Sequence, residues 1–280
     1  MGYNVDKVLE SSDLTWLGMG TFYLTKHGST AYGTNLPSSD IDYKGIAVPP
    51  SRYFDGFLHR FEQAEFHHQT DGVDMVVFDV RKFFRLAADC NPSIIEVLFT
   101  EPEDRVIVTA PAEAILSHRD MFLSKKAKHT FGGYAVSQLK KLQSHRRWLK
   151  FPPPAKPRFG ATLQEWRHYE TWLENRNKER PALEAKFGYD TKHGMHLVRL
   201  LRMGVEILRD QKVLVKRPDA QELLEIRAGA WTYERLLEYA QDQLVLLDDL
   251  YKTSTLPDAP DRNALDRLCS DIVSSQRYGW

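Results

Sequence analysis

The segment from Gly28 to Asp42 holds the residues best suited to chemistry on a phosphate group. Gly28 and Ser29 form a pair at the expected start of a helix, and after ten intervening residues Asp40 and Asp42 open an expected strand. Residues two apart in a strand project from the same face, so the two carboxylates are expected to stand side by side. Such a pair is costly unless a cation lies between its members, and these oxygen ligands suit Mg²⁺ or Mn²⁺.

The Gly28-Ser29 pair suits the phosphate itself. A glycine lets the backbone approach closely, and the serine and the first N–H groups of a helix can donate to phosphate oxygens. Gly28 and Gly33 have the separation found in a Walker A loop, but Thr34-Asn35 stands where that loop needs Lys and Ser or Thr. The alternative is that Asp40 is a turn residue and Asp42 a surface strand residue. The combination with Gly-Ser favours a metal and phosphate site.

Two further carboxylates, Asp74 and Asp79, lie on the next expected strand. Asp74 and Asp79 are five positions apart, so they face opposite sides of one strand and only one can join the pair. Asp74 lies between apolar residues at the strand start. Asp79 directly precedes an expected helix and can cap it, and Asp71 lies in an expected turn.

The elements that must position these residues change character along the chain. Turn residues and short apolar runs dominate to about residue 115, and long helical patterns follow. The strand over 73–80 is apolar on both faces, as a central strand is, and a second strand is expected over 40–48. We therefore predict an α+β catalytic domain on a small mixed sheet over residues 1–115, an all-helical domain over 116–280, and an active site between them. The helices expected there cover residues 130–149, 163–177, 190–208, 219–228, 232–251 and 260–275. Asp190 or Thr191 is expected to cap the third of them, and residues 219–222 are expected to form a capping box at the start of the fourth.

Two groups of basic residues in the second part could bind anions. Residues 121–160 carry ten Lys or Arg, no Asp or Glu, and interleaved aromatic residues, a pattern that suits single-stranded nucleic acid. Its alternative is a solvated helix face with partners from the acidic C-terminal region. In the helix after Asp190, one stripe holds Lys192, His196 and Arg199, and it could neutralise a triphosphate. The alternative is that the basic residues form ordinary ion pairs and that the histidine is partly buried. The residues we expect to contact nucleic acid are Lys140, Lys141, Arg146 and Arg147.

Composition excludes little. The 280 residues carry 38 basic and 38 acidic side chains, so the net charge says nothing about partners. Two distant cysteines argue against a disulfide framework or a zinc knuckle. There is no apolar signal segment and no run long enough to cross a membrane, so a soluble cytoplasmic protein is expected.

The pattern Gly28-Ser29, ten residues, Asp40-Ile41-Asp42 resembles the signature of the DNA polymerase beta nucleotidyltransferase superfamily. Residues 28–45 resemble more closely a bacterial and phage family of nucleotidyltransferases associated with RNA repair and RNA ligases. The resemblance covers residues 25 to 230. Its further stretches are residues 79–86, 91–96 and 189–201.

This resemblance implies transfer of a nucleoside monophosphate from a nucleoside triphosphate to an acceptor hydroxyl, on an RNA end, with release of pyrophosphate. It implies Asp40 and Asp42 as catalytic metal ligands, with a third acid on a neighbouring strand. Asp74 is favoured over Asp79 for that third position, because residues 73–76 resemble the apolar-Asp-apolar context of the family. The resemblance also implies an RNA ligase of the same pathway as a partner. The acceptor could instead be a protein side chain or a small molecule. A further alternative is that the chain is an inactive module that binds a nucleotide or RNA. The residues expected at the nucleotide are Gly28, Ser29, Ser39, Lys192, His196 and Arg199.

Overall fold

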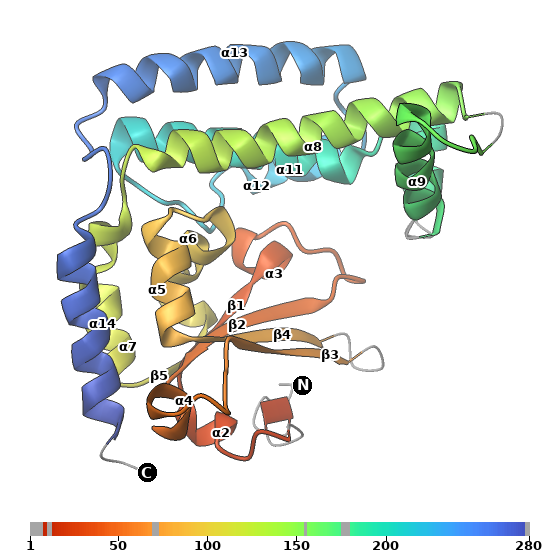
Figure 1. Ribbon diagram of the computed structural model, residues 1–280. Helices are drawn as coiled ribbons and strands as arrows, with labels where there is room; N and C mark the ends of the chain where they lie inside the picture. Colours follow the sequence, from red (N-terminus) through yellow and green to blue (C-terminus); the bar gives the residue numbers. More distant parts are fainter. Residues whose placement is uncertain (1–7, 10–12, 69–72, 154–155, 175–179, 278–280) are drawn as a thin grey trace.

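The structure is a computed structural model, and it describes most of the chain. The described residues are 8–9, 13–68, 73–153, 156–174 and 180–277. The fold is α+β, as the sequence predicts, with a mixed sheet in the first part and long helices in the second (Figure 1).

Five strands form the sheet in the described residues, in the order β3-β4-β2-β1-β5. Strands β2 and β4 are parallel, and the other neighbouring pairs are antiparallel. β2 and β4 confirm the two strands expected from the sequence, within one residue at each end, whereas the other three were not individually predicted. The bounds are β1 Thr21–His27, β2 Ile41–Ala47, β3 Gln63–His68, β4 Val73–Asp79 and β5 Arg105–Val108.

The register of the central strands brings distant parts of the sequence together. Asp42 on β2 lies opposite Asp74 on β4, and it also lies opposite His27, the last residue of β1. The short helix α3 (Gly28–Tyr32) begins directly after β1. The Gly-Ser turn and two of the three candidate carboxylates therefore meet at one end of the sheet.

Besides α3, four helices of eight residues or fewer surround the strands in the described residues, together with two longer ones. Helix α5 (Val80–Ala88) follows β4, and the C-terminal helix α14 (Arg262–Arg277) lies along α5 and α7 (Figure 1). The C-terminal helix therefore returns to the part of the fold that carries the sheet. The shorter helices are α2 (Leu17–Gly20), α4 (Arg52–Asp55), α6 (Pro92–Leu98) and α7 (Ala110–Ser117).

Helix α11 (Thr191–Asp210) is the centre of the helical part. It contacts α8, α12 and α13, and the long α8 and α13 run beside it in Figure 1. Fourteen residues of α11 are buried, so its apolar surface holds this part together. The other helices here are α8 (Lys126–Lys150), α9 (Ala161–Glu174), α10 (Arg180–Phe187), α12 (Ala220–Arg227) and α13 (Tyr233–Thr253).

One hydrophobic cluster runs through both parts of the chain. It includes Ile46 of the sheet, Phe131 of α8 and Leu201 of α11. The division into two domains at residue 115 stays a prediction. No helix in the described ranges is both long and apolar enough to span a membrane.

Helix capping follows the sequence at one position and departs from it at another. Asp190 caps α11 by accepting a hydrogen bond from the His193 N–H at 3.1 Å, as expected. The capping box expected at Asp219 was wrong, because the Asp219 side chain binds Arg202 and Arg217 and makes no cap hydrogen bond. Its charge is more strongly attracted by two guanidinium groups than by a backbone N–H.

Candidate active site

Asp42 lies at the centre of a group of charged side chains at the end of β2. Burial raises the pKa of its carboxyl, and the charges of Asp74 and Asp40 raise it further. Lys44 and Lys192 act in the opposite direction. The group thus joins three carboxylates from the sheet to a lysine from α11, and its crowded negative charge favours a bound cation.

Gly28 touches the Asp42 carboxylate. Its φ is +62°, and a Cβ atom at this position would lie 2.1 Å from Asp42 Oδ2. Position 28 therefore requires glycine twice, for the left-handed backbone and for the space that the carboxylate fills. The sequence had indicated only the approach of a phosphate.

Gly28→Ala is expected to destabilise the protein by about 1–2 kcal/mol, because L residues strain in the left-handed region, and to reduce activity by displacing the Asp42 carboxylate. Thermal unfolding and a nucleotidyl-transfer assay measure the two effects. Gly133→Ala in α8 is the matched control, because a Cβ there meets nothing within 4 Å. If Gly28→Ala and Gly133→Ala had the same unfolding temperature and the same transfer activity, the steric argument at position 28 would be contradicted.

Asp40 and Asp74 are more open than Asp42. Asp40 is exposed, and the side chain of Asp74 is 49% exposed. Asp74 Oδ1 lies 3.1 Å from His67 Nδ1, and this hydrogen bond and the carboxylate charge raise the pKa of His67. Within the described residues, no three His, Cys, Asp or Glu side chains are gathered closely enough to hold a metal ion as they stand.

Asp79, the competing third carboxylate, is engaged elsewhere. Its side chain accepts hydrogen bonds from the N–H groups of Arg81 and Lys82 and so caps α5, the role that the sequence offered as its alternative. It also binds the Arg81 guanidinium at 2.8 Å. In the parallel register it lies opposite Ala47, five residues along β2 from Asp42.

Lys44 is a residue of this site that the sequence analysis missed. It follows Asp42 at i+2, so it projects from the same face of β2. Its Nζ donates to the carbonyl oxygen of Ser93 at 3.2 Å and to the Ser93 hydroxyl. Burial lowers its pKa, while Glu96 and Asp42 raise it. The sequence could have indicated Lys44, because Asp40, Asp42 and Lys44 are each two residues apart and so share one face of the strand.

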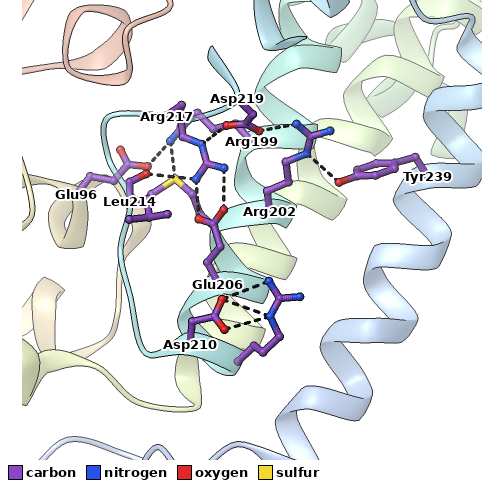
Figure 2. Close-up of polar contacts among 11 residues, drawn as sticks. Glu96, Arg199, Arg202, Glu206, Asp210, Leu214, Arg217, Asp219 and Tyr239 are labelled. Carbon is purple, nitrogen blue, oxygen red and sulfur yellow. Dashed lines mark hydrogen bonds and ion pairs between the residues drawn. The ribbon is translucent and has the colours of Figure 1, made fainter. Parts of the chain in front are cut away.

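A buried ion pair lies behind these residues. Glu96 is 1% exposed and Arg199 is 6% exposed. Arg199 Nη1 donates to Glu96 Oε1, and the Tyr32 hydroxyl donates to Glu96 Oε2. The guanidinium carbon lies 3.8 Å from the centre of the Tyr32 ring, and His27 Nε2 lies 3.2 Å from Glu96 Oε2. One carboxylate thus ties α3, the end of β1 and α6 to α11 (Figure 2 shows its bond to Arg199).

This pairing changes the part that Arg199 can take. The sequence placed it beside Lys192 and His196 at a triphosphate, but its charge is already paired with Glu96 and shielded from solvent. Lys192 is half-buried and close enough to Asp42 to lower its pKa. Burial and the charge of Arg199 lower the pKa of His196 to about 3, so this imidazole is neutral at pH 7.

The buried side chain of His27 predicts loss of stability in acid. Burial and then Lys44 lower the pKa of His27 to about 4, whereas an ordinary histidine has a pKa of 6.5. Between these values the unfolded chain binds a proton that the folded chain does not, so the free energy of unfolding falls as the pH falls. We expect His27 alone to contribute about 3 kcal/mol of this loss by pH 4. Urea unfolding from pH 7.5 to 4.5 measures the slope, and His27→Gln should flatten it; an unchanged slope in the variant would contradict the assignment.

A second network fixes the turn after α11 against α3. Arg217 binds both oxygens of Glu206, at 2.6 and 2.8 Å, and it binds Asp219 at 2.8 Å. Asp219 also accepts from Arg202, and the backbone N–H of Arg217 donates to the carbonyl oxygen of Tyr32 at 3.1 Å. Figure 2 shows these side chains converging. The far end of α3 is thereby held by the helical part.

The basic segment has found many partners within the protein. Among the expected nucleic-acid contacts, Arg146 binds Glu234 at 3.2 Å and lies 3.9 Å from the Tyr233 ring centre, and Arg147 binds Glu165. Lys140 and Lys141 are exposed and form no ion pair with any side chain in the described ranges. The alternative expectation of acidic C-terminal partners therefore holds for part of the segment. The segment's other ion pairs are Lys125–Asp258, Lys126–Asp89, Lys128–Asp248 and Lys156–Glu170.

The remaining expected nucleotide contacts lie near the carboxylates or in a neighbouring turn. Ser29 is half-buried in the first turn of α3. The Ser39 hydroxyl accepts from the Leu36 N–H at 2.9 Å, so it shapes the turn that leads into Asp40.

The fold and the motif are those of a nucleotidyltransferase of the polymerase beta type. Residues 9–271 match RlaP, described as an RNA repair pathway DNA polymerase beta family, and the chain belongs to this family. The resemblance seen in the sequence is thereby confirmed over most of the chain.

Two individual proteins show weaker likeness. An Enterobacteria phage T4 protein, named as an uncharacterized 38.9 kDa protein in the nrdC-mobD intergenic region, is 30% identical over 131 residues. The aligned stretch is 44% of this chain and only 39% of the T4 protein. The crystal structure of a nucleotidyltransferase-like protein from Exiguobacterium sibiricum 255-15 covers 84% of this chain and 69% of its own, at 10% identity and a TM-score of 0.28, which is too low to support an assignment.

Proposed function

We propose that the chain transfers a nucleoside monophosphate from a nucleoside triphosphate to an acceptor hydroxyl on RNA. The acceptor oxygen forms a bond to the α-phosphorus, and the bond from that phosphorus to the oxygen bridging to the β-phosphorus breaks. The hydroxyl proton passes to solvent water, and pyrophosphate leaves. The contact between Gly28 and the Asp42 carboxylate carries this proposal. It joins the candidate phosphate turn to the candidate metal ligands in one site.

Asp42, with Asp40 and Asp74, would hold Mg²⁺ or Mn²⁺. The raised pKa of the Asp42 carboxyl fits this role, because crowded carboxylates are stabilised by a cation and supply the oxygen ligands that these ions prefer. A bound ion supplies positive charge that stabilises the phosphate oxygens and lowers the pKa of the acceptor hydroxyl.

The protein's own groups bind and orient the triphosphate in this proposal. The N–H groups after Gly28 and the Ser29 hydroxyl donate to phosphate oxygens, and Ser39 supports the turn before the carboxylates. Lys192 supplies charge from the helical part. His196, neutral at pH 7, offers a hydrogen bond without a charge. We leave Arg199 out of the nucleotide contacts because Glu96 already binds it.

RNA is the acceptor that we favour, and a protein side chain or a small molecule is the alternative. The family description refers to RNA repair, and two exposed lysines of α8 leave positive charge open to solvent. In such a pathway an RNA ligase would use the repaired end.

The direct test uses the purified chain, Mg²⁺, each α-labelled nucleoside triphosphate in turn, and total cellular RNA. Label that nuclease releases would support RNA as the acceptor and would identify the nucleotide. Label that only protease releases would shift the proposal to protein modification. Absence of label with RNA and protein would contradict the RNA proposal and favour a small-molecule acceptor or an inactive module.

Neutralising the open lysines should weaken RNA binding in a salt-dependent manner. For Lys140→Gln/Lys141→Gln, the slope of log K against log salt concentration should decrease by about 1.4, since each contact to a single strand contributes about 0.7. Filter binding of a single-stranded RNA at several salt concentrations measures it. Arg146→Gln/Arg147→Gln is the matched control, because both guanidinium groups are already paired. Absent or salt-independent binding would contradict RNA as the ligand of this surface.

A further inference from the structure

A cavity of about 670 Å³ lies away from the candidate active site. It is lined by α4 and the segment after it, by α5, and by α14, which lie at one end of the sheet in Figure 1. Asp79 lines it, and the parallel register places Asp79 five residues along β4 from Asp74. At about 3.3 Å per residue this separation is about 16 Å, so the cavity and the carboxylate group are different sites.

Arginines give the cavity a positive character. Arg81 and Arg85 come from α5, Arg60 from the segment before β3, and Arg262 from α14. Arg60 and Arg85 are exposed and make no ion pair with any side chain in the described part of the chain. Arg81 is bound by Asp79, while its guanidinium carbon lies 3.9 Å from the ring centre of Phe54.

The acidic side chains of the lining do not balance these arginines. Asp79 caps α5 and binds the Arg81 guanidinium, and Glu62 binds Lys82 at 2.9 Å. Arg262 is bound by Asp89, which lies outside the lining. Asp266, the third acidic residue of the lining, therefore stands against two guanidinium groups without an ion pair in the described residues, those of Arg60 and Arg85. Unbalanced guanidinium groups around a cavity favour an anionic ligand, and phosphate is the anion whose oxygens their planar donors fit best.

Aromatic rings form the side of the cavity that follows α4. The rings of Tyr53 and His59 are 5.6 Å apart between centres, and those of Tyr53 and Phe61 are 6.5 Å apart. The rings of Trp16 and Phe61 meet edge-on, with 4.9 Å between their centres. These contacts hold the rings in place, so they offer a planar ligand a surface on which to stack.

We propose that this cavity is a second nucleotide-binding site. The base lies against Tyr53 and His59, and the phosphate lies at Arg60 and Arg85. The volume falls within the range of small-molecule sites, about 300–1,000 Å³. Because guanidinium groups supply the phosphate contacts, binding here needs no metal ion. The nucleotide is either free or the end of a single-stranded RNA, since both present a base with a phosphate.

Isothermal titration of the full chain with AMP in EDTA tests this site. We expect AMP to bind the native protein and Asp42→Asn equally, and adenosine to bind more weakly because it lacks the phosphate. Arg85→Ala should weaken AMP binding at least tenfold. Arg85 is exposed, so its truncation should leave the fold intact, and Arg60→Ala is a second variant of the same kind. Arg209→Ala, an exposed arginine of α11 outside the cavity, is the matched control.

Competition with a short 5′-phosphorylated RNA identifies the source of the nucleotide. Displacement of AMP assigns the site to an RNA end, and failure to displace it assigns the site to a free nucleotide. Absence of AMP binding in EDTA, or binding that survives both Arg60→Ala and Arg85→Ala unchanged, would overturn the proposal. Triphosphate binding that requires Mg²⁺ and is lost in Asp42→Asn tests the catalytic proposal separately, so the two can fail independently.

Discussion

Asp42→Asn is expected to lower nucleotidyl transfer by about 100- to 1,000-fold or more, the range seen when a group that stabilises transition-state charge is removed. The loss should come without a loss of fold. Burial and two neighbouring carboxylates disfavour the charged form of Asp42, as its raised pKa records. Asparagine removes this repulsion and keeps the shape that fits against Gly28. Such a residue is retained for function at a cost in stability.

The measurement therefore has two parts. In EDTA the variant should unfold at the same temperature as the native protein or at a higher one, and Mg²⁺ should stabilise the native protein more than the variant. Transfer is followed with α-labelled nucleotide under identical conditions. Activity close to native would show that Asp42 does not hold the metal.

A matched pair of variants separates the two candidates for the third carboxylate. Asp74→Asn should reduce transfer, because Asp74 lies directly opposite Asp42. Asp79→Asn should leave it largely intact, since asparagine also caps helices and Asp79 lies at the other end of the strand. The reverse result would move the metal site to Asp79.

The sequence was informative where structure depends on near neighbours. The spacing of Gly28, Ser29, Asp40 and Asp42 indicated a site whose glycine and carboxylate do touch. The strand over 73–80 was recognised because a buried strand is apolar on both faces, and the caps at Asp79 and Asp190 follow from short-range hydrogen bonds. β5 has four residues and β3 alternates polar side chains, so neither presents a strong apolar pattern.

Contacts between distant residues could not be predicted in the same way. Glu96 and Arg199 are 103 residues apart, and nothing in either local pattern indicates their pairing. Helical periodicity correctly grouped Arg199 with Lys192 and His196 along α11, but periodicity gives the face of a helix and not the partner that faces it. The partners of Lys125, Lys128 and Arg146 likewise come from the far end of the chain.

The Glu96–Arg199 pair gives the second large expected effect. Glu96→Gln keeps the shape of the side chain but removes its charge, so Arg199 remains buried with an unpaired positive charge. Burial opposes ionisation of Glu96, yet Arg199, His27 and Tyr32 hold its pKa well below the ordinary value, which shows how strongly the charged form is bound. Breaking one side of a buried pair typically costs about 3–5 kcal/mol. That is a large part of the roughly 5–15 kcal/mol by which a domain is stable.

Urea unfolding of Glu96→Gln and of Asp249→Asn distinguishes a buried pair from an exposed one. Asp249 binds Lys252 on the surface of α13, with both side chains largely exposed, so its loss should cost less than about 1 kcal/mol. Glu96 joins α6 to α11, and α11 carries Lys192 toward Asp42. Transfer by Glu96→Gln should therefore fall even at temperatures where the variant remains folded. A loss of stability below about 1 kcal/mol would mean that water or another group satisfies Arg199, and the pair would then not be what holds the helical part against the carboxylates.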